Sequence, residues 1–168
     1  MMKKIIYSLL FFLAIHTVSA QQTPADKQTR AFSIEGATAH LGNGKVIENS
    51  LIMFDGGKIT FVGSAMMKIA RMGTIINANG KHVYPGFIAA NASLGLVEID
   101  AVKASDDEDE IGTMNPHIRS LIAYNAESKV VESMRPNGVL MAQITPRGGI
   151  ISGTSSIVQL DAWNWEDA

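Results

Sequence analysis

The sequence predicts an α/β protein whose N-terminal part is rich in β-strands. Two observations lead to this fold class. Short runs of alternating apolar residues, separated by glycine turns, fill residues 31–84, and such runs are typical of antiparallel strands. A strand, a helix and a second strand then follow one another in residues 86–145. That order predicts a βαβ unit after the β-rich part.

The first 20 residues have the composition of a secretory signal peptide. Two lysines at positions 3 and 4 precede an apolar run at residues 5–15, and residues 18–20 (VSA) offer small side chains for cleavage before Gln21. The alternative is a membrane anchor, but this apolar run is much shorter than the roughly 20 residues that span a bilayer. We therefore expect a periplasmic or secreted protein with no stable membrane anchor after cleavage.

Composition limits the partners of the mature chain. The chain has no cysteine, so neither disulfides nor a lipid-modified N-terminus can stabilise or anchor it. Removal of the leader leaves 12 basic residues against 16 acidic ones. This acidic balance gives no electrostatic reason to expect a nucleic-acid or anionic-membrane partner, and it leaves a small-molecule substrate open.

Residues 31–84 are expected to form a small antiparallel sandwich or open barrel, after a flexible polar lead-in at residues 21–30. Asp55–Lys58 (DGGK) predicts a tight hairpin turn, because glycine accepts the positive φ angles that such turns require. Asn79 and Gly80 predict a second hairpin of type I′. Several short strands joined in this way are typical of β-sandwiches.

Residues 85–168 have a different pattern. Gly86–Ile99 and Val139–Thr145 are continuously apolar, which predicts strands buried on both faces. Pro116–Met134 has apolar residues at helical spacing. The acidic run at residues 106–110 predicts a solvated loop, with ion binding as the alternative.

Several motifs resemble the amidohydrolase superfamily, in its imidazolonepropionase-like branch. They are "GKHVYPGFI" (residues 80–88) and "NGVLMAQITPRGGIISGTSSIVQLDAWNW" (residues 137–165). The resemblance covers Phe32 to Ala168. It implies the N-terminal part of a β-sandwich at residues 31–84, followed at residues 85–168 by the first units of an incomplete TIM-like (β/α) barrel.

Length adds an expectation about completeness. A closed (β/α) barrel takes roughly 250 residues, more than this chain of 168 residues supplies. We therefore expect a truncated chain, whose partner is the missing C-terminal portion or a tandem amidohydrolase domain.

The resemblance also implies hydrolysis of amide-like, non-peptide carbon–nitrogen bonds with one or two divalent metals such as zinc. The family motif supplies an aspartate and two histidines after "PGFI", where this chain has Ala89, Asn91 and Ser93. None of the three is a usual donor to a catalytic transition metal. We expect this chain to hold no metal cofactor and to be inactive alone, although its full-length form would be a hydrolase. The alternative is a metal-free binding or scaffolding domain.

Other residues give weaker expectations. Asn91 and Ser93 remain candidate ligand-binding positions. The Gly-rich loop after residue 145 could bind an anion, or its hydroxyls could cap a following helix. Its candidate residues are Arg147, Ser152, Thr154 and Ser155. Trp163 and Trp165 could stack on a ligand, or pack in a core.

The histidines of the mature chain form no metal-binding motif in the sequence. His40 and His82 are expected at the surface or at strand edges of the β-rich part, and His117 at the start of a helix. No pair has the spacing of HxH or HExxH.

The leader generates the first testable prediction. Material recovered from the periplasm or the medium should begin at Gln21 when its N-terminus is sequenced, because a signal peptidase cuts after the small residues at positions 18–20. Replacing Ala20 by a bulky residue, as in Ala20→Phe, should prevent this cleavage. Mature protein that keeps Met1 would contradict the prediction.

Overall fold

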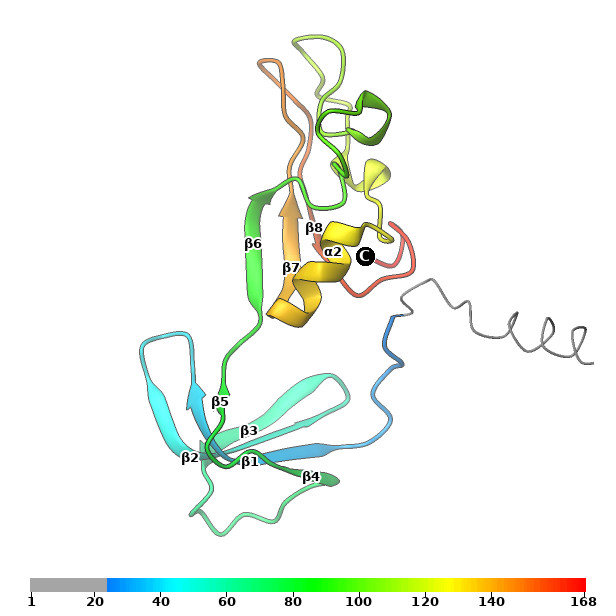
Figure 1. Cartoon of the computed structure of the whole chain (residues 1–168). Helices are drawn as coiled ribbons and strands as arrows, with labels where there is room; N and C mark the ends of the chain where they lie inside the picture. The colour runs from blue at the N-terminus through cyan, green and yellow to red at the C-terminus, as the bar shows by residue number, and fades with distance from the viewer. Residues whose placement is uncertain (1–23) are drawn as a thin grey trace, which may run out of the picture. The chain divides into compact units, whose positions relative to one another are not determined.

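The computed structural model describes residues 24–168, so the expected signal peptide lies outside the described residues. The described chain is rich in strands, contains little helix and forms two sheets (Figure 1). It divides into two compact units, Ala25–Phe87 and residues 88–168. This strand-rich architecture confirms the expected fold class.

The first unit is a single five-stranded sheet. Its strands lie in the order β3-β2-β1-β4, and β5 also pairs with β1. Their bounds are β1 Phe32–His40, β2 Val46–Asp55, β3 Lys58–Ser64, β4 Thr74–Asn77 and β5 His82–Val83. The chain turns back between β1 and β2 and again between β2 and β3, so these three strands are antiparallel. The central β1 has small or apolar buried side chains at Ser33, Ala37 and Ala39.

The hairpin between β2 and β3 forms as the sequence predicts. Gly56 and Gly57 have φ angles of 56° and 74°, the positive values that favour glycine over other residues. Asp55 and Lys58 are the flanking pair of the antiparallel ladder. Adjacent glycines between two alternating apolar runs were therefore a sufficient signal here.

The second predicted hairpin is wrong. β4 and β5 both run parallel to β1 on the same edge, and only Gly80 of the Asn79-Gly80 pair has a positive φ. The connection between β4 and β5 runs beside Gly36, where the pairing of β1 is irregular. A Cβ on Gly36 would lie 1.9 Å from Asn79 Oδ1. Gly36 thus leaves room for the Asn79 side chain, and after Asn79 the chain continues parallel to β1 as β5.

Polar contacts fasten the connections of this sheet. The Ser33 hydroxyl donates to Met72 O and accepts from Met72 N, at 2.8 and 2.9 Å. Arg71 pairs with Glu35 at 2.9 Å and donates to carbonyls of the β3–β4 connection. The side chain of Gln28, in the lead-in that we expected to be flexible, accepts from Gly57 N at 2.7 Å.

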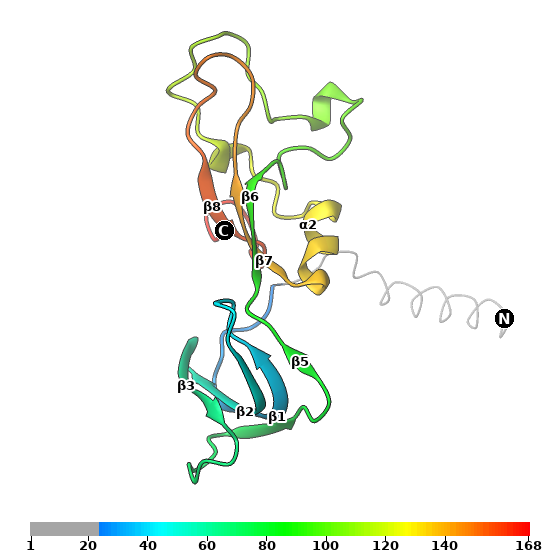
Figure 2. The ribbon, with the colours of Figure 1, turned by 90° about the vertical axis from the view of Figure 1, so that its left-hand side faces the viewer.

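The second unit contains a three-stranded sheet in the order β6-β7-β8. Its strands are β6 Phe87–Ala92, β7 Val139–Ile144 and β8 Ser156–Gln159, and its helical segments are η1 Lys103–Ser105, η2 Ser120–Ala123, α2 Lys129–Met134 and η3 Arg135–Asn137. β6 and β7 run in the same direction (Figure 1), and β8 is antiparallel to β7. The helix α2 lies against one face of this sheet (Figure 2). The βαβ unit is therefore present.

The predicted helix at residues 116–134 is much shorter in the structure. Ser128 caps α2 by accepting from Val131 N at 3.4 Å. The preceding backbone bonds elsewhere: Asn125 N donates to Gly95 O at 2.8 Å and Ser120 N to Thr154 O at 3.1 Å. These tertiary hydrogen bonds replace the helical ladder that apolar spacing alone had suggested.

The predicted burial of both barrel-like strands is also wrong. β6 ends at Ala92 rather than near Ile99, and Ile88 is 63% exposed. β6 has one neighbour in its sheet, so its side chains lack the cover that a central strand receives. β7 is buried on the α2 side, at Ala142 and Ile144, and exposed on the other side at Met141.

The core of the second unit forms between α2 and the sheet. It contains seven buried residues: Leu96, Tyr124, Val131, Ala142, Ile144, Val158 and Leu160. A Cβ at Gly95 would lie 2.5 Å from the Tyr124 ring, so the absence of a side chain there admits the aromatic ring. The Tyr124 hydroxyl is buried without a hydrogen-bond partner among the described residues.

Tyr124 gives a pH-dependent prediction. Burial raises its pKa to about 12, although the nearby charge of Arg135 acts in the opposite direction. An unfolded tyrosine ionises at about pH 10, so the folded state keeps the proton longer and stability should fall between about pH 10 and 12. Tyr124→Phe should remove this alkaline loss of stability in urea unfolding experiments.

The exposed Tyr84 offers a matched control. Tyr84→Phe should keep the late-titrating phenol in an ultraviolet absorbance titration, whereas Tyr124→Phe should abolish it. Equal alkaline destabilisation of the wild type and Tyr124→Phe would contradict the assignment.

Candidate functional site

The three positions that replace the family's metal ligands lie on and just after β6. Ala89 packs against the core of the second unit, and Asn91 is exposed with a φ of 52°. Ser93 follows the strand, where its carbonyl accepts from Leu96 N at 2.9 Å. The left-handed backbone at Asn91 breaks the strand's alternation. Alternation alone therefore does not place the side chains of Asn91 and Ser93 side by side.

The ends of β6 and β7 meet at one edge of the sheet. Thr145, directly after β7, donates its backbone N–H to Ala92 O at 3.0 Å. Its hydroxyl is buried and has no hydrogen-bond partner within residues 24–168. The carboxyl ends of parallel strands are where barrel enzymes place their sites, so Thr145 joins Asn91 and Ser93 as a candidate. It was not among the residues expected from the sequence, because a threonine at a strand end carries no signal of its own.

The Gly-rich loop after β7 is a hairpin connection. We expected a loop leading into a helix, but the chain returns as β8, antiparallel to β7, so there is no following helix for its hydroxyls to cap. Ser152 Oγ donates to Gly148 O, and Ser155 Oγ accepts from Gln143 Nε2 at 3.3 Å. Thr154 donates its backbone N–H to Ile118 O at 2.8 Å. The loop's polar groups therefore serve to join segments of the unit.

Arg147 is held by the acidic run. Its backbone N–H donates to Glu108 O at 2.6 Å, and its Nε lies 3.1 Å from Glu108 Oε2. Lys103 pairs with both Asp106 and Asp109. The acidic residues are thus partly neutralised, and residues 106–110 form an anchored loop rather than a freely solvated one.

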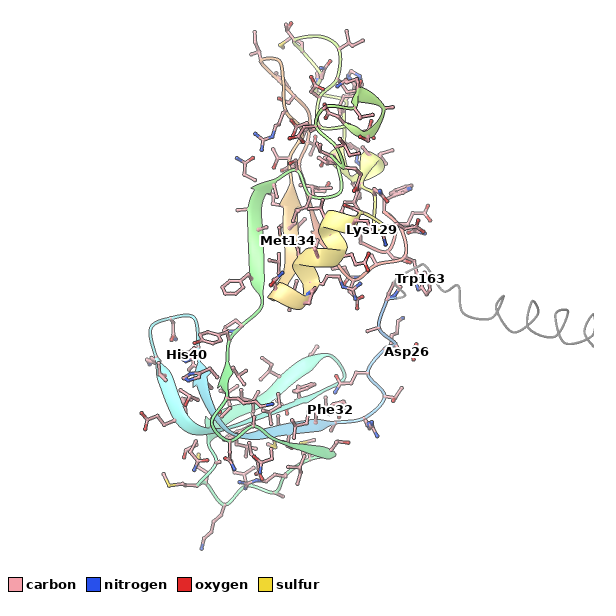
Figure 3. All side chains as sticks on the ribbon, in the orientation of Figure 1. Asp26, Phe32, His40, Lys129, Met134 and Trp163 are labelled. Carbon is pink, nitrogen blue, oxygen red and sulfur yellow. The ribbon has the colours of Figure 1, made fainter. Side chains whose placement is uncertain are left out.

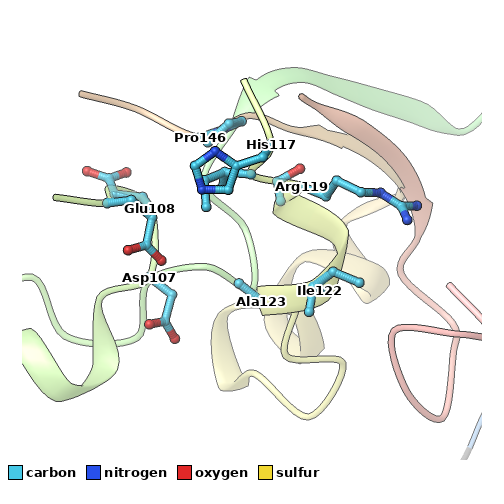
Figure 4. A pocket seen from close by; sticks show the side chains of 10 residues that line it. Asp107, Glu108, His117, Arg119, Ile122, Ala123 and Pro146 are labelled. Carbon is cyan, nitrogen blue, oxygen red and sulfur yellow. The ribbon is translucent and has the colours of Figure 1, made fainter. Parts of the chain in front are cut away.

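The same acidic run lines a pocket of about 390 Å³. Figure 4 shows His117 in this pocket beside Glu108 and Pro146. The lining residues are Asp107, Glu108, Glu110, His117, Ile118, Arg119, Ser120, Ile122, Ala123 and Pro146. No sequence pattern links His117 to the acidic run, because the contacts that bring them together arise only from the fold.

The pocket has the features of a small polar binding site. Carboxylates and an imidazole line a volume at the low end of the range for ligand pockets, together with the apolar Ile122 and Ala123, whereas the Arg119 guanidinium points away from His117 (Figure 4). Nevertheless, no three histidine or acidic residues in the described part of the chain are arranged to hold a metal ion. The pocket therefore supports recognition of a small polar molecule better than it supports metal chemistry.

The strand-end positions do not fit a catalytic divalent metal either. Ala89 has no donor atom, and Asn91 and Ser93 offer only neutral oxygen or nitrogen donors. Zinc in catalytic sites is held by imidazole, thiolate and carboxylate.

The tryptophans near the C-terminus do not join the core. Trp163 is 53% exposed and Trp165 37% exposed, so the expected burial of these rings is wrong. Asp161 pairs with Arg135 just before this segment.

Comparison with known proteins identifies the fold. No family model and no curated protein match the chain. An amidohydrolase from Thermotoga maritima has a similar structure, with a TM-score of 0.72 and 22% sequence identity over 81% of this chain. The fold is thus that of the β-rich N-terminal domain and first barrel units of an amidohydrolase, as the motifs had led us to expect.

Other similar structures share smaller parts of the fold. A prolidase solved with N-methylphosphonate-L-proline has a TM-score of 0.46 and 19% identity, covering 67% of this chain and 25% of its own. A molinate hydrolase has a TM-score of 0.37 and 26% identity, covering 44% and 16%. The present chain spans about a third, 35%, of the Thermotoga protein.

The donor set of β6 generates a prediction about zinc. Purified chain dialysed against EDTA should contain far less than one zinc per chain by elemental analysis, because Asn91 and Ser93 bind Zn²⁺ weakly. The triple variant Ala89→Asp, Asn91→His, Ser93→His should retain more zinc than the wild type. Stoichiometric zinc that resists EDTA and is lost in Asn91→Ala would contradict the prediction.

Proposed function

We propose that this chain is the N-terminal part of an exported hydrolase that acts on amide-like, non-peptide carbon–nitrogen bonds in its full-length form. The observation that carries the proposal is the structural likeness to the Thermotoga amidohydrolase over 81% of the chain. The fold alone does not define a reaction. The position of Asn91, Ser93 and Thr145 at the carboxyl ends of adjacent parallel strands adds support, since barrel enzymes use that edge.

Binding would depend on this chain's own groups. The pocket beside His117 offers carboxylate acceptors from Asp107 and Glu110 and an imidazole that can donate a hydrogen bond. Amide-like substrates have both a carbonyl acceptor and an N–H donor, and such a mixed lining suits both. A zinc ion in the full-length protein would have to take its ligands from residues other than Ala89, Asn91 and Ser93.

A second function is favoured by those same three residues. Their lack of strong metal donors supports a metal-free binding or scaffolding domain, which works beside a separate amidohydrolase domain. In that case the small molecule would bind without being hydrolysed.

Export is part of the proposal. The composition of residues 1–20 supports cleavage after Ala20 and a periplasmic or secreted mature chain. No helix within residues 24–168 has the length and apolar character to cross a membrane.

Hydrolysis can be tested on two polypeptides expressed from the same gene. One ends at Ala168, and the other continues through whatever codons follow it in the coding DNA. We expect only background hydrolysis of cyclic amides by the first, and zinc-dependent hydrolysis of cyclic amides by the second. EDTA-treated longer protein is the matched control.

The outcomes separate the two candidate functions. Binding of a cyclic amide without turnover by the longer protein would favour the scaffolding alternative. Hydrolysis by the shorter polypeptide, lost in Asn91→Ala, would show a site that works without the family's metal ligands.

A further inference from the structure

Two histidines that are far apart in the sequence meet on the five-stranded sheet of the first unit. His40 Nε2 and His82 Nδ1 lie 2.9 Å apart. His40 ends β1, near the turn into β2 (Figure 3), and His82 begins β5. One ring donates and the other accepts in this hydrogen bond, according to their tautomers.

Strand register places both rings on the same face. Thr38 pairs with His82 in the parallel β1–β5 ladder. Because side chains alternate along a strand, His40 lies on the same face as Thr38, and hence beside His82. Tyr84 follows on that face, and its ring stacks on His40 with centroids 4.2 Å apart and an interplanar angle of 6°. The stacking restrains the orientation of the His40 imidazole.

We propose that His40 and His82 form a two-histidine binding site for a divalent transition metal. Consider two nitrogens that each lie about 2.05 Å from one metal ion. The nitrogens are then about 2.9 Å apart if the nitrogen–metal–nitrogen angle is a right angle, and about 3.3 Å apart if it is tetrahedral. The observed separation already matches the first arrangement. Each ring would have to turn by about 45° to direct its lone pair from the other nitrogen toward a shared ion, and the stacking of Tyr84 on His40 leaves the larger part of this movement to His82.

Metal binding requires one tautomer to change but no net loss of protons. In the hydrogen-bonded pair, one bridging nitrogen carries a proton. When the metal takes its place, that proton moves through solvent to the other nitrogen of the same ring. Both imidazoles remain neutral, the form that binds metals. Water completes the coordination, because His82 is exposed and the pair lies at the surface.

The donor type predicts which metals bind. Imidazole nitrogen suits Cu²⁺, Ni²⁺ and Zn²⁺, whereas Mg²⁺ and Ca²⁺ prefer oxygen. The Irving–Williams order then predicts tightest binding of Cu²⁺. With two protein ligands the metal should be removed by EDTA, so this site is distinguishable from an EDTA-resistant catalytic zinc.

The test is titration of the untagged chain with Cu²⁺, Ni²⁺, Zn²⁺ and Mg²⁺ by calorimetry. Because the second imidazole binds an ion already held by the first, we expect His40→Ala or His82→Ala to weaken Cu²⁺ binding by about 100-fold. His117→Ala, which removes an exposed histidine of the second unit, is the matched control and should leave the affinity unchanged.

Spectroscopy provides a second measurement. The electron paramagnetic resonance spectrum of the Cu²⁺ complex should show coupling to two imidazole nitrogens in the wild type and fewer in either variant, with circular dichroism confirming that each variant folds. Equal Cu²⁺ affinity of the wild type and both variants would overturn the proposal, as would loss of binding only in His117→Ala. Either result would leave the proposed hydrolase function untouched.

Discussion

Strand β7 organises the second unit, because it is paired on both sides, by β6 and by β8. Its Ala142 and Ile144 are fully buried beneath α2. From its carboxyl end the chain passes through Thr145 into the loop that carries Arg147, and there the backbone bonds to both β6 and the acidic run. Strand β7 therefore positions the candidate residues of β6, the anchored acidic loop and the pocket beside His117.

Local signals were sufficient where neighbours in the sequence are also neighbours in space. The two glycines between β2 and β3 specify a hairpin that needs no distant contact. The Asn79-Gly80 pair has the same local chemistry but a different outcome, because the irregularity at Gly36 in β1 lets β4 and β5 continue along one edge. Likewise, hydrogen bonds from Ser120 and Asn125 to distant carbonyls shorten the expected helix. Tertiary hydrogen bonding overrides periodicity when the alternative partners are equally good.

The candidate sites also differ in whether the sequence alone could predict them. That Ala89, Asn91 and Ser93 include no imidazole, thiolate or carboxylate is evident from the sequence, because it depends only on residue type. The pairing of His40 with His82 could not, because their distance depends on the parallel register of β5 against β1. A spacing search finds ligands on one strand or helix, whereas a pair on adjacent strands has no fixed separation in the sequence.

The exposed side of the β6-β7-β8 sheet connects stability with function. Gln143 pairs with Ile157 across the β7–β8 ladder, on the face opposite the buried Ala142 and Val158. Ile157 is 64% exposed and Met141 37%, so this face presents apolar surface to water at a cost of roughly 25 cal/mol per Å². A hydrolytic site at the ends of β6 and β7 would also need walls that orient the substrate and limit bulk water while admitting the attacking water molecule. The three described strands do not provide such walls. Additional structure packed on this face would meet both needs together. The proposed activity and the burial of these side chains are therefore coupled.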